Sequence, residues 1–253
     1  MVAAAARAGS FAVVRRIPAA EARQGVAVDQ KHFYAIGNRV IGKYDKRTAA
    51  LIRRWEAADD EPIVHLNSGA VIDGKLYCAH SNYPGVPMSS SIEVFDTDTL
   101  SHLHSHAFGV FEGSATWVDR HDGSWWVAFA NYEGKGGQVG RGPEATSVVR
   151  FDSSWSVESR YRFPAEIIER FGTRSNSGGV WGTDGLLYAT GHDAAEIYVL
   201  ELPETGTVLD LVEIVPAAIE GQGIAWDPTS SGALYAALKG AGQIAIVQRR
   251  RGE

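Results

Sequence analysis

The sequence predicts an all-β protein, a five-bladed β-propeller whose ring is closed by an N-terminal strand that pairs with the last blade. The first observation is a pattern that occurs five times. Its fullest copy begins at Ser177 with small polar residues and continues as an apolar run, a turn at Asp184-Gly, and a second apolar run that ends before His192. This pattern is typical of a strand, a tight turn and an antiparallel strand.

The second observation is the spacing of the copies. The glycines near the start of the copies, Gly25, Gly69, Gly113, Gly178 and Gly223, are separated by 44, 44, 65 and 45 residues. A period of about 40 to 50 residues built from short strands is typical of propellers, in which each repeat forms one four-stranded blade. The longer third step indicates an insertion of roughly twenty residues in one blade.

The remaining apolar runs complete the blades. We expect one domain over residues 1–253, with blades at approximately 24–56, 67–108, 113–163, 177–215 and 222–248. The fifth blade reaches the end of the chain after its third strand, whereas 10–17 is a strand without a blade of its own. We therefore predict that 10–17 supplies the missing outer strand and removes the open edge of the ring.

Composition limits the classes of partner. The chain has 253 residues, is 45% hydrophobic and carries a formal charge of -6, which disfavours nucleic acid and acidic membranes as partners. No apolar run approaches the length of about eighteen residues that a membrane span requires. We expect a monomer that binds a small polar molecule. The sequence leaves its compartment open between the cytoplasm and export after removal of a signal peptide.

One mouth of the central channel is the predicted site. In an antiparallel blade, the start of the first strand and the end of the second strand lie at the same face. The polar residues at these positions are chemically unlike one another, whereas repetition alone would make them similar. Distinct polar and ionisable groups that converge in one concave place predict a site, although water in a channel mouth would also explain polar side chains there.

Two groups of residues follow from this geometry. The predicted catalytic residues are His80, His192 and Lys239, which we expect to point into one pocket. The predicted substrate-binding residues are Gln24, Asn38, Asn67, Asn82, Tyr83, Ser114, Asn131, Tyr132, Asn176 and Gln222.

The opposite strand ends carry aspartates. Asp29, Asp73, Asp119, Asp184 and Asp227 all stand in turn contexts, so we interpret them as turn residues. No metal or other cofactor is predicted. Three alternating histidines, 102, 104 and 106, share a face of an expected outer strand, where polar side chains ordinarily protect an exposed edge.

The first and last blades carry a family resemblance. Arg23-Gln-Gly-Val, Gly221-Gln-Gly-Ile-Ala-Trp-Asp-Pro and Ala236-Ala-Leu-Lys resemble the blade openings and closing strand of the five-bladed plant and bacterial glutaminyl-peptide cyclotransferases. The resemblance implies that Gln24 and Lys239 occupy pocket positions. This chain has Asn67-Ser and Ser177 where that family has acidic residues, so the group that would handle a substrate α-amine is missing.

A second resemblance covers the whole chain. His65-Leu-Asn-Ser, the segment from Trp117 to Trp126, and Ser175-Asn-Ser-Gly-Gly-Val-Trp are similar to bacterial propellers labelled cycloisomerases. We expect an enzyme that forms or opens a ring in a small polar molecule by proton transfer, with a neutral histidine as base. The alternatives are a propeller that binds a ligand or protein without chemistry, and a metal-assisted lactone hydrolase.

Overall fold

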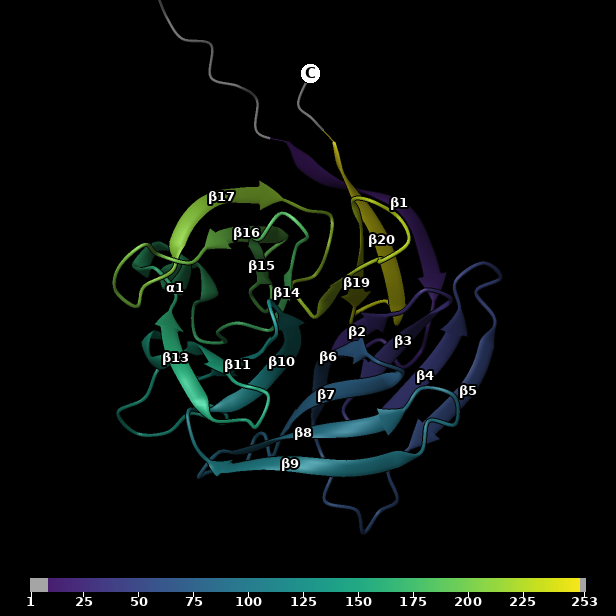
Figure 1. The fold of residues 1–253 in the computed structure, drawn as a ribbon, viewed down its shortest axis with the longest axis horizontal. Helices are drawn as coiled ribbons and strands as arrows, with labels where there is room; N and C mark the ends of the chain where they lie inside the picture. Colours follow the sequence, from purple (N-terminus) through teal and green to yellow (C-terminus); the bar gives the residue numbers. More distant parts are fainter. Residues whose placement is uncertain (1–8, 251–253) are drawn as a thin grey trace, which may run out of the picture.

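The protein is a ring of five antiparallel four-stranded sheets around a central axis, and the computed structural model describes residues 9–250 (Figure 1). Blade one contains β2 (Gly25–Val28), β3 (His32–Gly37), β4 (Val40–Asp45) and β5 (Leu51–Glu56). Blade two contains β6 (Leu66–Ile72), β7 (Lys75–Ser81), β8 (Ser89–Asp96) and β9 (His102–Val110). Blade three contains β10 (Ser114–His121), β11 (Ser124–Ala130), β12 (Ser147–Phe151) and β13 (Val157–Arg162).

The other two blades complete the ring. Blade four contains β14 (Gly178–Trp181), β15 (Leu187–Thr190), β16 (Glu196–Glu201) and β17 (Asp210–Pro216). Blade five contains β18 (Ile224–Trp226), β19 (Ala233–Leu238), β20 (Gln243–Arg250) and β1 (Ser10–Pro18). The longer third repeat holds η1 (Pro143–Ala145) and α1 (Ala165–Phe171). Neither of these helices is long and apolar enough to cross a membrane, and the described residues contain no other helix.

The N-terminal strand closes the ring, as the sequence predicts. β1 runs antiparallel to β20, from Ser10 opposite Arg250 to Pro18 opposite Gln243 (Figure 1). Phe11 and Ile17 point inward from β1 and are 2% and 1% exposed. The pairing gives β20 a partner on its outer side, so the fifth sheet has four strands like each of the other sheets.

The core lies between the blades. Five clusters of buried apolar side chains fill the five interfaces between neighbouring sheets, and each cluster draws on two blades. Tyr34 of blade one, for example, packs in the same cluster as Leu76 and Phe95 of blade two. Side chains alternate between the two faces of a strand, and each sheet is covered on both faces by its neighbouring sheets. This explains the nearly continuous apolar runs of the second and third strands.

The inner strands touch near the axis and divide the channel. A Cβ atom placed on Gly25 would lie 2.5 Å from the Cα atom of Ser68, and one on Gly223 would lie 2.7 Å from the Cα atom of Gly25. These positions therefore require glycine because backbones approach one another there. Two separate cavities result, one at each end, and they share no lining residue.

Candidate functional site

The first cavity lies at the mouth where first strands begin and second strands end. Its volume is about 600 Å³, within the range of small-molecule sites. We call it the amide cavity. It is lined by Gln24, Asn38, Val64, His65, Asn67, Tyr83, Pro84, Thr116, Tyr132, Glu133, Lys135, Thr173, Arg174, Ser177, His192 and Lys239.

Seven of the residues singled out from the sequence line the amide cavity. They are Gln24, Asn38, Asn67, Tyr83, Tyr132, His192 and Lys239. The three amides are held in place by two hydrogen bonds: Gln24 Nε2 donates to Asn38 Oδ1 at 2.7 Å, and Asn67 Nδ2 donates to the Ala115 carbonyl at 2.8 Å. Their placement follows from strand direction, whereas their roles in binding stay a prediction.

Five other predicted binding residues lie outside the cavity lining. Ser114 and Asn176 are fully buried, and the Asn176 Nδ2 donates to the carbonyls of Gly178 and Thr190. The side chains of Asn82, Asn131 and Gln222 likewise bond to nearby main chain. Their polar atoms stabilise strand ends and loops, which is why they are not presented to a ligand.

Neighbours of two of these residues face the cavity instead. Thr116 and Ser177 line it in place of Ser114 and Asn176. In β10 the pairing with β11 shifts between Ala115 and Trp117, so Thr116 is a bulged residue. A bulge re-aims the side chains around it, and an alternating strand pattern does not predict where it occurs.

His80 does not line the cavity, which corrects the prediction that it points into the same pocket as His192 and Lys239. The Val64 N–H donates to His80 Nε2 at 3.1 Å, so that nitrogen carries no proton. His80 Nδ1 then donates to Ser91 Oγ at 2.8 Å, and the Ser91 hydroxyl donates to Glu93 Oε1. Burial lowers the pKa of His80, which keeps the ring neutral. Both ring nitrogens are used in hydrogen bonds within the protein.

His65 is the histidine of this blade that faces the cavity. It stands one residue before β6 and is 9% exposed, yet neither ring nitrogen has a hydrogen-bond partner among residues 9–250. Burial is the main reason that its pKa is lowered to about 4, and the neighbouring His80 and Lys239 contribute in the same direction. The imidazole is therefore neutral at pH 7, with its polar atoms available to a ligand.

His192 is the second imidazole on the cavity wall. Its Nδ1 lies 2.6 Å from Asp193 Oδ1, an arrangement in which the ring donates its proton to the carboxylate. Nε2 has no partner in the described part of the chain. Burial lowers the pKa of His192, Asp193 opposes this effect, and Lys239 and Arg174 add to it. The cavity thus holds a neutral, oriented imidazole with one free acceptor.

Loops from three blades build the wall around these groups. The Tyr83 ring lies 4.9 Å from His65 and 5.3 Å from Tyr132, measured between centroids. Gly136 has a φ of +78°, and a Cβ atom there would lie 2.5 Å from Cε2 of Tyr83, so the β11 to β12 loop needs glycine to cover this ring. The same loop is tied to the segment between α1 and β14 because the Glu133 N–H donates to the Thr173 carbonyl.

The charges on the amide cavity are mainly positive. Lys135, Arg174 and Lys239 line it, and Glu133 is the single carboxylate among the lining residues. Lys135 and Lys239 make no ion pair within residues 9–250, and the Arg174 Nε lies 3.9 Å from Asp193 Oδ2. The positive lining contrasts with the formal charge of -6 on the whole chain.

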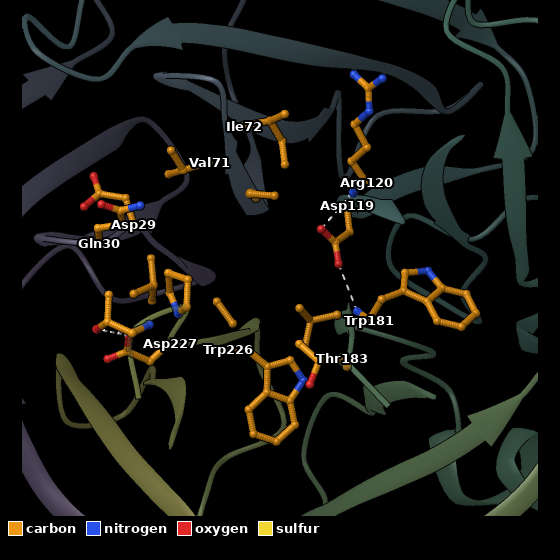
Figure 2. A pocket seen from close by; sticks show the side chains of 18 of the residues that line it. Asp29, Gln30, Val71, Ile72, Asp119, Arg120, Trp181, Thr183, Trp226 and Asp227 are labelled. Atoms are coloured by element: carbon orange, nitrogen blue, oxygen red, sulfur yellow. Dashed lines mark hydrogen bonds between the residues drawn. The ribbon is translucent and has the colours of Figure 1, made fainter. Parts of the chain in front are cut away.

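The second cavity lies at the opposite mouth and is larger, about 1750 Å³. We call it the aspartate cavity (Figure 2). Its lining includes the five aspartates at the ends of the first strands: Asp29, Asp73, Asp119, Asp184 and Asp227. Figure 2 shows Asp119 between blades three and four, where its carboxylate accepts the N–H of Trp181 at 2.9 Å and that of Arg120 at 2.8 Å.

Most of these carboxylates accept hydrogen bonds from neighbouring residues. Asp29 accepts the Tyr34 hydroxyl and two backbone N–H groups of its own hairpin, and Asp184 accepts the Tyr188 hydroxyl and the Leu186 N–H. Burial raises the pKa of Asp119 to about 6, against the two N–H groups that lower it. Across residues 9–250, no three His, Cys, Asp or Glu side chains lie together as a metal site would require.

Comparison with known proteins supports the fold. No family model matches the chain, and no curated protein matches it by sequence. A hydrazine synthase structure from Kuenenia stuttgartiensis is similar with a TM-score of 0.54 and 11% identity, covering 90% of this chain and 84% of that one. The PQQ-bound aldose sugar dehydrogenase from Streptomyces coelicolor is similar with a TM-score of 0.56 and 12% identity, covering 97% and 100% of the two chains.

These similarities concern architecture. At such identities they show the propeller fold, and chemistry on a shared fold depends on the site. Neither structure is a cyclotransferase, so the specific resemblance read from the first and last blades has no support from these comparisons. The chain is a five-bladed β-propeller that resembles propellers of known enzymes in fold.

Proposed function

We propose that this propeller is a small-molecule enzyme that forms or opens a ring by proton transfer in the amide cavity. One observation carries the proposal: His192 is bonded through Nδ1 to Asp193, and its Nε2 is left free at the cavity wall. This is the arrangement of a general base, because the carboxylate holds the ring in one tautomer and orients it.

The proposed step uses groups already in the cavity. A hydroxyl or amine of the substrate attacks a carbonyl carbon of the same molecule, forming the ring bond, while its proton passes to His192 Nε2. The negative charge on the carbonyl oxygen is stabilised by the Lys239 ammonium. The bond to the leaving group then breaks, and the leaving group takes the proton from His192. Ring opening follows the same steps in reverse.

His65 has a positioning role in this proposal. A ring with a pKa of about 4 is a weak base, so it is less suited than His192 to remove a proton at pH 7. As a neutral group with free nitrogens beside the Tyr83 ring, it instead offers the substrate a hydrogen bond and a flat surface. His80 is replaced in the proposed machinery because its nitrogens are already bonded.

Proton NMR of a panel of small lactones, cyclic amides and their open hydroxy and amino acids tests the proposal, because it detects ring opening and closing directly. On any compound that turns over, His192→Gln should lower kcat/KM by about 10²- to 10⁴-fold, the contribution of a general base. His104→Gln is the matched control, since His104 is exposed on the outer strand β9. Turnover by His192→Gln equal to that of the control contradicts the proposal, and binding without turnover favours a binding propeller.

A further inference from the structure

We propose that the ligand of the amide cavity is a planar organic anion, a flat ring or conjugated group that carries a carboxylate or another oxyanion. The inference deepens the proposed function and rests on it for the location of the site. It adds the class of substrate, which is given by the charge of the lining and by the shape of one wall.

The charges that line the amide cavity are unbalanced. A ligand in the cavity meets Lys135, Arg174 and Lys239, against Glu133 alone. Lys239 is partly buried and has no acidic partner in the described chain, although it is close enough to lower the pKa of both His65 and His192. A cation held without a partner beside two neutral imidazoles favours a ligand that supplies the missing negative charge.

The Arg174 side chain matches the geometry of an oxyanion. Arg174 offers a planar fork of donors, and its contact with Asp193 is long, 3.9 Å at 59% and 71% side-chain exposure. Such a contact is weak in water, so it leaves the guanidinium available. Arginine forks bind carboxylates and phosphates through two parallel hydrogen bonds, which a neutral amide does not match.

One wall of the cavity is aromatic. The His65 and Tyr83 rings lie 4.9 Å apart and are tilted by 39°, and Tyr132 meets Tyr83 edge-on at 5.3 Å and 68°. His65 is nine-tenths buried and its ring nitrogens lack partners among residues 9–250, so a ligand beside it gains both a stacking surface and a hydrogen bond. Together the three rings favour a planar group over a bulky aliphatic one.

Four small molecules test whether the cavity binds planar organic anions. Benzoate, phenyl phosphate, benzamide and cyclohexanecarboxylate are titrated at millimolar concentration into the full chain, with binding followed by the ring-proton signals of His65 and His192. Benzoate should bind about tenfold more tightly than neutral benzamide, and more tightly than the non-planar cyclohexanecarboxylate. A comparison of benzoate with phenyl phosphate shows which oxyanion the cations prefer.

Matched variants locate the charge recognition. Lys239→Met should weaken benzoate binding by about tenfold and leave benzamide binding unchanged. Lys31→Met removes a lysine of the aspartate cavity instead and should leave benzoate binding as it is. Equal binding of benzoate and benzamide, equal effects of the two variants, or no binding of any anion overturns the inference.

The outcomes separate this inference from the proposed function. His192→Gln should still bind benzoate, because its neutral side chain leaves the cations in place. A loss of turnover in that variant with anion binding intact supports both ideas. Normal turnover in His192→Gln contradicts only the proposed base, whereas turnover of compounds that are neutral and non-planar contradicts only the substrate class.

Discussion

The two mouths of the channel are built from the same repeated strands, yet they use polar residues in opposite ways. At the aspartate cavity, carboxylates such as Asp29 and Asp184 bond to a tyrosine and backbone N–H groups of their own hairpins. At the amide cavity, the nitrogens of His65 and the ammonium of Lys239 have no partner within residues 9–250. Polar groups that repeat and are satisfied stabilise blades, whereas groups that differ and lack partners are available to a ligand.

Size alone would favour the aspartate cavity over the site that we propose. The aspartate cavity has about three times the volume of the amide cavity, 1750 Å³ against 600 Å³. Its acidic groups are explained by turns. The amide cavity is lined by loops of blades two and three and by the segment between α1 and β14. The unpartnered polar groups, and not the volume, therefore support our proposal for the amide cavity.

The largest expected effect comes from the contact that separates the mouths. Gly25→Ala places a Cβ atom 2.5 Å from the Cα atom of Ser68, and backbone cannot yield as a side chain can. We expect a loss of unfolding free energy of about 3 kcal/mol or a failure to fold. Gly240→Ala is the control, since its new Cβ would meet only the flexible end of Glu220 at 3.3 Å. Urea unfolding measures the unfolding free energy of both variants. Equal values for Gly25→Ala and Gly240→Ala would show that the inner strands can separate.

The next effect tests the aspartate mouth. Asp29→Ala removes the acceptor for the Tyr34 hydroxyl and for the N–H groups of Lys31 and His32. We expect a loss of about 2 to 3 kcal/mol in unfolding free energy, because partly buried donors lose their partner. Benzoate binding at the other mouth should not change. A variant with normal stability and weaker ligand binding would reverse the roles that we assign to the two mouths.

A slightly smaller effect concerns the pH dependence of stability. The pKa of His65 is about 4 in the folded protein and 6.5 in the unfolded chain, so the unfolded state binds the proton first as the pH falls. The contribution of the neutral His65 to the unfolding free energy is complete above pH 6.5 and is lost as the pH falls toward 4. It decreases by about 2 kcal/mol between pH 7 and pH 5.

His65→Gln should remove this part of the pH dependence. Urea unfolding at pH 7 and pH 5 should give a difference about 2 kcal/mol smaller in His65→Gln than in the unmodified protein. The exposed His104, replaced by Gln, serves as the control and should keep the original difference. An unchanged pH dependence in His65→Gln would mean that His65 is not buried in its neutral form.

The smallest effect is expected at an aspartate whose side chain makes no hydrogen bond within residues 9–250. Asp73 has a φ of +48°, a conformation that asparagine also tolerates. Asp73→Asn should change the unfolding free energy by less than about 0.5 kcal/mol. Thermal unfolding checks this, and a large loss would show that charge at the aspartate mouth matters beyond the hydrogen bonds of single hairpins.

The sequence by itself determined the fold and the location of one mouth. Five copies of one strand pattern at a nearly constant period specify five blades, and the unpaired run at 10–17 specifies how the ring closes. Strand direction then places Gln24, His192 and Lys239 at one end, because antiparallel neighbours reverse at each turn. These conclusions depend only on local patterns and on chain order.

Only the tertiary structure decided which of those polar groups a ligand can reach. His80 and His65 lie near each other in blade two, but the Val64 N–H and the Ser91 hydroxyl bond to the His80 ring, while the ring nitrogens of His65 have no partner among residues 9–250. A register shift between Leu66 and Gly69 alters the start of β6, and a loop of blade three covers Tyr83. Hydrogen bonds and bulges between segments far apart in the chain set these details, and no local periodicity encodes them.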